Sequence, residues 1–380
     1  MKLDLKNYNR IVIKIGSSLI ISEGKLREDW LEKLSKNISD FISNNIEIII
    51  VTSGAVALGK SILKLNNKKL SIEQKQACAA VGQIELMSFY KKIFNKNNYQ
   101  VAQILLTASD CNSRVRYLNC KNTIENLLKN QVIPIINEND SIANEEIKIG
   151  DNDRLAARVA QMSSADLMIL LSDIDGLYDK NPTTHKDAKF ISEVKNITKE
   201  IENMAGSSTS SIGTGGMITK IIATKMALSI NCQVIITSGI ENNCLEKLKN
   251  NQKKFTFFYG QKKSLKTSKH ITTARKSWLS GVVNARGEAI INNLACETIK
   301  NKKVSLLPIG VVSIKGKFSK GDVIFVKDLK GKHIASGITN YSSDEAKKII
   351  QKKSNEVKKI FGNDAKSELI HLNNLVLTDN

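Results

Sequence analysis

Between residues 10 and 240, short apolar runs alternate with longer amphipathic stretches. Six of these runs are rich in Val, Ile and Leu and are predicted to be strands: Arg10–Ile15, Ile46–Val51, Val101–Leu106, Val132–Ile136, Leu167–Leu171 and Gln233–Thr237. The predicted helices between them span 28–44, 71–95, 113–129, 153–162 and 217–230. Because strands that are apolar throughout are buried on both faces, this rhythm predicts an α/β fold. The expected architecture is a mostly parallel open sheet sandwiched by helices.

The rhythm changes after a stretch rich in Gly, Lys and Ser at 260–270. Brief strands are expected there, at Val304–Leu307, Asp322–Val326 and His333–Ile338. One charged helix is expected over 343–361, with Ser342 and Glu345 as a capping box at its start. A chain of 380 residues is too long for one ordinary core. We therefore predict a first domain at 1–262, a linker at 263–274 and a small β-barrel-like domain at 275–380.

Composition narrows the class of protein. No run of about 18 apolar residues is present to cross a bilayer, and the N-terminus lacks a signal-like apolar segment. We therefore expect a soluble protein of the cytoplasm with no membrane partner. The six cysteines are scattered without a C-x-x-C pair, so neither a disulfide framework nor a zinc site is indicated.

The net charge of +20 is concentrated toward the C-terminus, where residues 261–380 carry 23 Lys and Arg against 10 Asp and Glu. A basic region of this kind can bind RNA. Lys, Asn and Ile are frequent along the whole chain, however, as the codons of a genome poor in G and C would produce. Drift on a solvated surface is therefore the favoured explanation, and RNA binding stays an alternative.

The segment Gly54–Ser61 satisfies the P-loop pattern G-x-x-x-x-G-K-[ST] after a predicted strand. Leu167–Asp173 could then serve as the second Walker motif. A P-loop needs backbone amides arranged around phosphates, whereas Ala55–Leu58 is apolar and favours a helix. We expect this segment to lie within a helix, and a P-loop NTPase stays an alternative.

Two lysines are candidates for holding a phosphoryl group. Lys14 interrupts an apolar strand just before Gly16-Ser17-Ser18, whose amides could approach an anion, although such a lysine can also simply reach water. Thr214–Lys220 begins a predicted helix with a glycine-rich backbone, which could bind a phosphate. The alternative is an ordinary glycine loop with a solvated lysine. Together the two favour phosphoryl transfer, which needs fixed positive charge around the phosphoryl oxygens.

Polar and acidic residues follow the other predicted strands, where ligands of α/β sheets collect. Gly150–Asp153 begins a helix, and one N-cap explains only one of its polar residues. The others could orient the lysines, bind Mg²⁺ through water or hold a substrate ammonium. Asn139 and Asp140 suit a small zwitterion, with an Asx turn as the alternative. Asp173 and Asp175 suit nucleotide or metal contacts, or merely the turn that follows.

Four of these segments resemble the amino-acid kinase family, and within it the glutamate 5-kinases: Val51–Ala55, Ile136–Asp140, Gly150–Asp153 and Thr214–Lys220. Three later segments resemble the PUA domain appended to the bacterial members: Ser305–Val311, Gly316–Asp322 and Asn340-Tyr341. The resemblance runs nearly end to end. Several motifs in order are far more specific than one glycine loop.

The resemblance implies roles for individual residues. The catalytic residues would be Lys14, Lys220, Asp153 and Gly54, with the lysines neutralising the phosphoryl group and Asp153 holding them. Glutamate would be bound by Ser53, Asp140, Asn152 and Asp151. ATP would be bound by Lys14, Ser172, Asp173, Thr214, Gly215, Gly216, Met217, Ile218, Thr219 and Lys220. Ser17 and Ser172 stand where the family pattern has Thr, and both keep a hydroxyl.

The implied reaction uses ATP and Mg²⁺ to phosphorylate the γ-carboxylate of L-glutamate. Its product, L-glutamyl 5-phosphate, opens proline biosynthesis, and the resemblance implies feedback inhibition by proline at the 139–150 loop and a homodimer or homotetramer. A carboxylate is ionised at neutral pH and needs no general base, in agreement with the absence of His from these motifs. Acetylglutamate, aspartate, carbamate or uridylate are alternative acceptors within the family. The sequence does not indicate which acids coordinate Mg²⁺.

Overall fold

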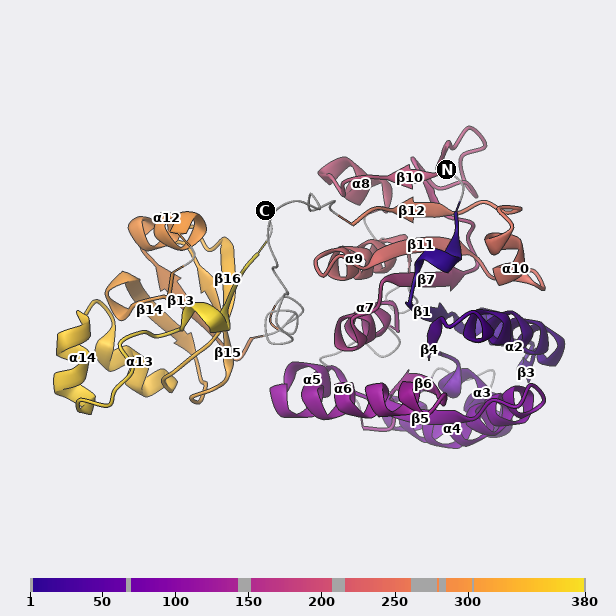
Figure 1. Cartoon of the computed structure of the whole chain (residues 1–380), viewed down its shortest axis with the longest axis horizontal. Helices are drawn as coiled ribbons and strands as arrows, with labels where there is room; N and C mark the ends of the chain where they lie inside the picture. The colour runs from indigo at the N-terminus through magenta and orange to yellow at the C-terminus, as the bar shows by residue number, and fades with distance from the viewer. Residues whose placement is uncertain are drawn as a thin grey trace. The chain divides into compact units, whose positions relative to one another are not determined.

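The computed structural model describes residues 3–65, 70–142, 152–206, 216–260, 279, 285–302 and 304–378. The chain divides into two compact units, Met1–Thr267 and Ser268–Asn380 (Figure 1). The predicted linker at 263–274 lies outside the described residues. None of the described helices combines the length and the apolar content needed to cross a membrane. All six cysteines are buried and free.

The first unit is built on an eight-stranded sheet in the order β10-β12-β11-β7-β1-β4-β6-β5. Its strands are β1 (Arg10–Ile15), β4 (Glu47–Val51), β5 (Val101–Leu106), β6 (Ile133–Glu138), β7 (Leu167–Ser172), β10 (Glu193–Val194), β11 (Gln233–Ser238) and β12 (Thr256–Phe258). All neighbours from β11 to β5 run parallel, and β12 runs antiparallel to β11. The six predicted strands are confirmed, whereas the short strands β10, at the edge of the sheet, and β12, beside it, were not expected.

The helices of this unit are α1 (Ser17–Ile20), α2 (Glu28–Ser43), α3 (Ala55–Ile62), α4 (Ile72–Asn95), α5 (Ala108–Asn112), α6 (Arg114–Lys129), α7 (Asn152–Ser163), α8 (Lys199–Met204), α9 (Met217–Leu228) and α10 (Cys244–Lys249). Two small hairpins, β2 (Ile21–Ser22) with β3 (Lys25–Leu26) and β8 (Leu177–Tyr178) with β9 (Phe190–Ile191), complete it. The five predicted helices correspond to α2, α4, α6, α7 and α9, with ends that agree to within two residues.

Alternation along β1 decides which layer each side chain meets. Ile11, Ile13 and Ile15 belong to the core shared with α2, α4 and α10. Successive strand residues point to opposite faces, so Val12 and Lys14 lie on the face that α7 covers (Figure 1). α9 packs beside α7 and against β11. The pleat therefore directs the one lysine of this strand toward α7 and α9.

The P-loop alternative for Gly54–Ser61 is wrong, because α3 begins at Ala55 and takes up the whole interior of the pattern. Gly59 serves helix packing instead of phosphate binding, since a Cβ there would lie 1.8 Å from the carbonyl oxygen of Cys78. A Cβ on Gly82 would likewise lie 1.9 Å from the carbonyl oxygen of Ala55. α3 and α4 thus cross with their backbones in contact.

The second unit has a five-stranded sheet in the order β14-β13-β15-β16-β17. Its described elements are β13 (Gly287–Ile291), α12 (Asn293–Lys302), β14 (Val311–Gly316), β15 (Val323–Lys327), β16 (His333–Ile338), α13 (Ser343–Ile349), α14 (Ser354–Phe361) and β17 (Leu375–Leu377). The predicted strands at 322–326 and 333–338 are confirmed as β15 and β16. β13 pairs with β15 in parallel, and the remaining pairs are antiparallel.

Two predictions for this unit are wrong. Val304–Leu307 is not a strand, because only Leu306 forms a single bridge, to Ile370, before Pro308 begins a 3-10 turn. The helix predicted over 343–361 is two helices, and Gln351 between them adopts a positive φ of 60°, which no α-helix continues through. The capping box of Ser342 with Glu345 is present at the start of α13.

Candidate active site

The sheet order places several polar loops at one edge. β7, β1, β4 and β6 are parallel neighbours, so their carboxyl ends lie together. The chain passes from β1 to β4 on one side and later returns to β7 on the other, which makes β1 the point where the order reverses. In open α/β sheets, ligands bind in the crevice at such a point. The loops that follow these strands are therefore expected to form the ligand site.

Lys14, Asp153 and Lys220 meet at this edge, each from a different element. Lys14 Nζ lies 2.6 Å from one carboxylate oxygen of Asp153, and Lys220 Nζ lies 3.2 Å from the other. The exposed fractions are only 9% for Lys14, 2% for Asp153 and 3% for Lys220. Burial by itself would raise the pKa of Asp153, but the two lysines outweigh it and hold that pKa below its usual range. One ionised carboxylate thus fixes two buried ammonium groups.

Gly54 brings the loop after β4 against the loop after β1. Its φ is +113°, a conformation that L side chains rarely adopt. A Cβ at this position would lie 2.9 Å from Cδ1 of Ile21 and 3.9 Å from Cβ of Ser17. Glycine is therefore required both by the backbone conformation and by the space available. It lets the backbone of the loop after β4 lie close to the side chains of Ile21 and Ser17.

Asn152 joins this charged cluster to a second, uncharged one. Its Nδ2 donates toward the carbonyl of Thr52 at 2.6 Å, the hydroxyl of Ser53 at 2.8 Å and Oδ1 of Asn137 at 2.9 Å. Asn152 is the first residue of α7 and Asp153 is the second. The predicted glutamate-binding residues Ser53 and Asn152 therefore lie together, beside the predicted catalytic lysines.

Apart from Oδ1 of Asp153, which pairs with Lys14, two acceptor atoms near this cluster are buried without a hydrogen-bond partner among the described residues: Oδ1 of Asn152 and Oδ1 of Asp140. Burial raises the pKa of Asp140 to about 6. Asp140 follows Asn137 by three residues, at the carboxyl end of β6. A cationic donor could satisfy each of these oxygens, and beside Asp140 it would favour the ionised form of that carboxyl. Asp151, also predicted to bind glutamate, lies outside the described residues.

The predicted nucleotide residues fall on two elements. Ser172 ends β7 and donates from its buried hydroxyl to Asp173, which is exposed. Gly216 caps α9, and the hydroxyl of Thr219 lies 3.1 Å from Oδ2 of Asp153. Met217 and Ile218 complete the first turn of α9, half-buried. Thr214 and Gly215 lie outside the described residues.

Sequence reasoning missed the contribution of α4. Gln83 accepts a hydrogen bond from Nδ2 of Asn137 at 2.8 Å, and Tyr90 shares one of 2.9 Å with the hydroxyl of Thr52. A signal was present in the sequence, because helical spacing puts Gln83 on the same face as the apolar residues Ala79 and Leu86. A glutamine on such a face needs a polar partner.

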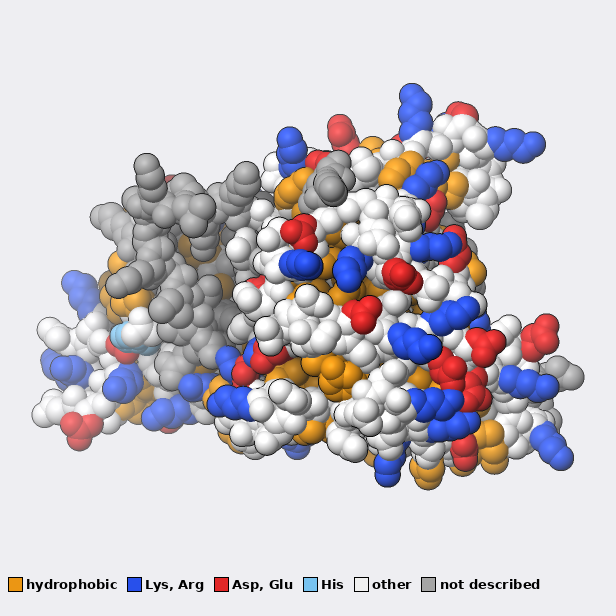
Figure 2. Space-filling model, turned by 45° about the vertical axis from the view of Figure 1, so that its right-hand side comes forward, with side chains coloured by type: hydrophobic (Ala, Val, Ile, Leu, Met, Phe, Trp, Pro, Cys, Tyr) orange, Lys and Arg blue, Asp and Glu red, His pale blue; other side chains and the backbone are white. Residues whose placement is uncertain are grey.

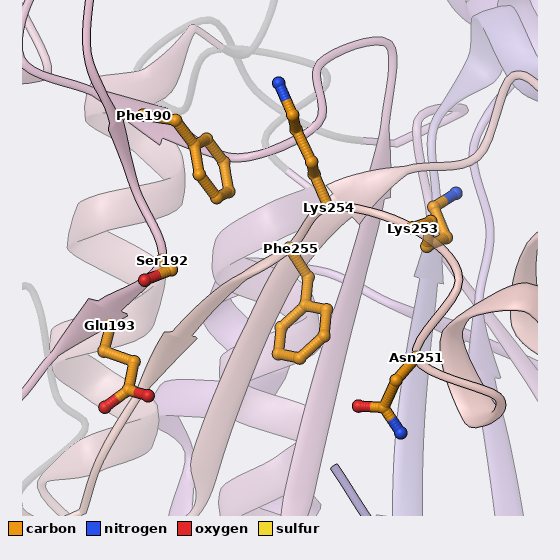
Figure 3. A pocket seen from close by; sticks show the side chains of 7 residues that line it. All are labelled: Phe190, Ser192, Glu193, Asn251, Lys253, Lys254 and Phe255. Atoms are coloured by element: carbon orange, nitrogen blue, oxygen red, sulfur yellow. The ribbon is translucent and has the colours of Figure 1, made fainter. Parts of the chain in front are cut away.

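A separate pocket of about 190 Å³ lies at the β10–β12 edge of the sheet and contains none of the predicted residues (Figure 3). Its lining residues are Phe190, Ser192, Glu193, Asn251, Lys253, Lys254 and Phe255. Lys254 Nζ lies 5.6 Å from the centroid of the Phe190 ring. Lys253 donates to the carbonyl of Ser238, and burial lowers its pKa. Both ammonium groups therefore already have interactions within the chain.

No group of three or more His, Cys, Asp or Glu side chains among the described residues is arranged to hold a metal ion. Mg²⁺ commonly binds through one or two carboxylates together with substrate phosphates and water. The side chains present fit an ion that arrives with a nucleotide better than an ion held permanently by the protein.

Comparison with known proteins identifies the family. The amino acid kinase family matches residues 9–238, and the PUA domain matches residues 287–361. A glutamate 5-kinase of Brucella anthropi is 43% identical over 99% of this chain and 98% of its own length. One of Pelagibacter ubique is 45% identical over 98% of this chain and 99% of its own. The crystal structure of UMP kinase from Ureaplasma parvum is 17% identical, covers 66% of this chain and 98% of its own, and has a TM-score of 0.46. By the span of the family match and the identity to these full-length relatives, the chain belongs to the amino acid kinase family and carries a C-terminal PUA domain.

Proposed function

We propose that this chain is a glutamate 5-kinase, which transfers the γ-phosphoryl group of ATP to the γ-carboxylate of L-glutamate. The observation that carries the proposal is the convergence of Lys14 and Lys220 on Asp153, directly beside Asn152 and Ser53. Fixed positive charge next to a polar acceptor site suits a reaction between two anions. The names of the full-length relatives support glutamate as the acceptor.

In the proposed reaction, a γ-carboxylate oxygen of glutamate forms a bond to the γ-phosphorus of ATP. The bond from that phosphorus to the β,γ-bridging oxygen breaks, and ADP leaves with the electron pair. No proton moves, because the attacking carboxylate is already ionised at neutral pH. Lys14 and Lys220 neutralise charge on the transferring phosphoryl oxygens, and Asp153 keeps both lysines in position. In this proposal, the amide of Gly54 belongs to the loop nearest to the transferring phosphoryl oxygens.

The remaining predicted residues divide between the two substrates. Ser53, Asp140, Asn152 and Asp151 hold glutamate, and the unpartnered oxygens of Asp140 and Asn152 accept from its ammonium group. Ser172, Asp173 and the segment 214–220 would hold ATP, and Mg²⁺ bound with the nucleotide would supply further positive charge to its phosphates. The product, L-glutamyl 5-phosphate, is the first intermediate of proline biosynthesis from glutamate. Residues 1–262 contain all of these groups.

The proposal is tested by incubating the protein with glutamate, ATP and hydroxylamine and measuring the γ-glutamyl hydroxamate. Lys14→Ala and Lys220→Ala are each expected to lower kcat by at least about 100-fold, the usual cost of one electrostatic group at a transition state. Lys60→Ala, in the last turn of α3, is the control and should retain activity. ADP formed faster with acetylglutamate, aspartate, carbamate or uridylate than with glutamate would refute the choice of acceptor.

We also propose that proline inhibits this enzyme by competing with glutamate, and that the enzyme is a homodimer or homotetramer. The residues predicted for the competition, 139–150, lie largely outside the described part of the chain. Proline at millimolar concentration should raise the KM for glutamate without changing kcat. Sedimentation equilibrium would measure the assembly, and a mass of one chain would refute the oligomer.

RNA binding by the second unit is a further candidate function, supported by its PUA domain and by its basic composition. On the face drawn in Figure 2, Lys and Arg side chains are interspersed with Asp and Glu. RNA affinity of the whole protein should fall steeply as salt rises from 50 to 200 mM. Binding that is absent at 50 mM salt would remove this candidate.

A further inference from the structure

The acceptor site is connected to α4 by a chain of buried side-chain amides. Gln83 on α4, Asn137 on β6 and Asn152 on α7 are 8%, 2% and 4% exposed. Asn137 donates to Oε1 of Gln83 at 2.8 Å, and Asn152 donates to Oδ1 of Asn137 at 2.9 Å. These three residues, called the amide relay below, come from segments far apart in the sequence. Residues 54 positions apart are thus joined by one hydrogen bond.

Two backbone groups determine which way each amide of the relay faces. The backbone N–H of Glu138 can only donate, and it lies 2.9 Å from Oδ1 of Asn137. The carbonyl of Thr52 can only accept, and it lies 2.6 Å from Nδ2 of Asn152. The oxygen and nitrogen of both asparagines are therefore assigned by chemistry. Nδ2 of Asn137 must therefore donate to Gln83, and Gln83 must accept with its side-chain oxygen.

This polarity leaves one oxygen over at the substrate end of the relay. Because Nδ2 of Asn152 is committed to Thr52 and Asn137, its Oδ1 faces the other way and has no hydrogen-bond partner among the described residues. Reversing the amide would set its nitrogen where the oxygen now lies and would leave two acceptors facing each other. The relay therefore presents an acceptor, never a donor, to whatever Asn152 binds.

We propose that Gln83 is a positioning residue for the acceptor substrate. The backbone groups of Glu138 and Thr52 set which way the amides face, and Gln83 holds the side chain of Asn137 in place, so that Asn152 stays bonded to it with its free oxygen toward the substrate ammonium. The inference rests on the proposed function, since it concerns the same glutamate site. The selectivity that follows is for an acceptor carrying a free ammonium group rather than an acylated nitrogen, which has one N–H to offer and no charge.

The crossing of α3 and α4 explains how a residue of α4 reaches the site. Gly82, the neighbour of Gln83, brings its backbone against the carbonyl of Ala55, in the turn that follows Ser53 and Gly54. A larger side chain at Gly82 would separate the helices and withdraw Gln83 from Asn137. Position 83 is thus held by backbone contact to the same loop that supplies Ser53. The relay and the loop are fixed together.

The test compares two substitutions at position 83. Gln83→Met keeps the length of the side chain but removes the acceptor, and it should raise the KM for glutamate about tenfold, the effect of losing one buried hydrogen bond. The kcat and the KM for ATP should stay within twofold. Gln83→Glu keeps an acceptor oxygen toward Asn137. It replaces Nε2, which has no hydrogen-bond partner among the described residues, with an oxygen and makes the group ionisable. It should keep the KM for glutamate within about threefold of the original value at pH 8.

A double-mutant cycle identifies the route of the effect. In an Asn152→Ala background, Gln83→Met should lower kcat/KM by less than twofold, because the residue through which it acts is gone. A full tenfold loss in that background would overturn the proposal, and so would equal losses for Gln83→Met and Gln83→Glu. The matched control is Gln161→Met. Gln161 lies near the end of α7, is 1% exposed and donates to the carbonyl of Met226. The substitution should lower stability without changing the KM for glutamate.

Failure of the relay and failure of the proposed function give different results. If the unmodified protein forms no hydroxamate, the kinase proposal fails, and glutamate binding by calorimetry then tests the relay without any reaction. If the unmodified protein is active and Gln83→Met has an unchanged KM for glutamate, the relay fails and the kinase proposal stands.

Discussion

Replacing Asp153 with Asn tests the central cluster most directly. The substitution keeps the shape of the side chain but removes the one carboxylate between two ammonium groups that are 9% and 3% exposed. Removing one partner of a buried ion pair costs about 3–5 kcal/mol, because the remaining charge stays buried without compensation. At about 2–4 °C per kcal/mol for a domain of this size, Asp153→Asn should lower Tm by roughly 6–20 °C. We expect kcat to fall about 100-fold or more, since both lysines lose their position.

The stability that Asp153 contributes should depend on pH in a defined direction. The folded-state pKa of Asp153 lies below its unfolded value because Lys14 and Lys220 favour the charged form. Its contribution to stability is therefore fully present above the unfolded pKa of about 3.9 and is lost as pH falls through the folded pKa. Urea unfolding of both proteins should show a constant gap in the free energy of unfolding from pH 8 to 5. The gap should narrow below about pH 4.

Two further variants provide a control and a partial rescue. Glu28→Gln breaks the pair with Lys92, whose side chains are 45% and 59% exposed, and should leave the free energy of unfolding nearly unchanged. Adding Lys14→Met to Asp153→Asn should restore part of the lost stability, because it removes one stranded charge. If Asp153→Asn unfolds within about 1 kcal/mol of the original protein at pH 7, the cluster does not have the electrostatic role described.

Three other substitutions have defined outcomes. Asp140→Asn should raise the free energy of unfolding by about 1–3 kcal/mol at pH 7, because burial raises the pKa of Asp140 to about 6 and its charge destabilises the protein without ligand. The same variant should weaken glutamate binding. It should also abolish any rise in the KM for glutamate below pH 6. Gly54→Ala should lower stability by about 1–3 kcal/mol and reduce kcat, because its φ is +113° and the new Cβ would lie 2.9 Å from Ile21; chemical denaturation and the hydroxamate assay measure the two effects. Gly82→Ala should lower Tm and raise the KM for glutamate together, because its Cβ would lie 1.9 Å from the carbonyl of Ala55; an unchanged Tm would contradict the close helix crossing.

The elements of the first unit were largely predictable, because apolar runs buried on both faces and long amphipathic helices leave strong local patterns. The errors occur where local pattern is weak. The strand expected at 304–307 is interrupted by Pro308, and the helix expected at 343–361 is broken near Gln351, which adopts a positive φ. The short strand β12, second from the edge of the sheet, has three residues and carries too little pattern to detect.

The sequence alone identified Lys14, Lys220, Asp153 and Asn152 as candidates, because each stands in a motif whose residue types suit a phosphate or a small zwitterion. Only the family resemblance implied that they meet. No local pattern could show it, since β1, α7 and α9 are separated by more than a hundred and by more than fifty residues along the chain. The order of the parallel sheet and the pleat of β1 decide that Lys14 points toward α7 and α9 rather than toward α2. The helical spacing of α4 marks Gln83 as a glutamine that needs a polar partner, but only the tertiary structure decides that the partner is Asn137, because Gly82 brings α4 against the backbone of Ala55.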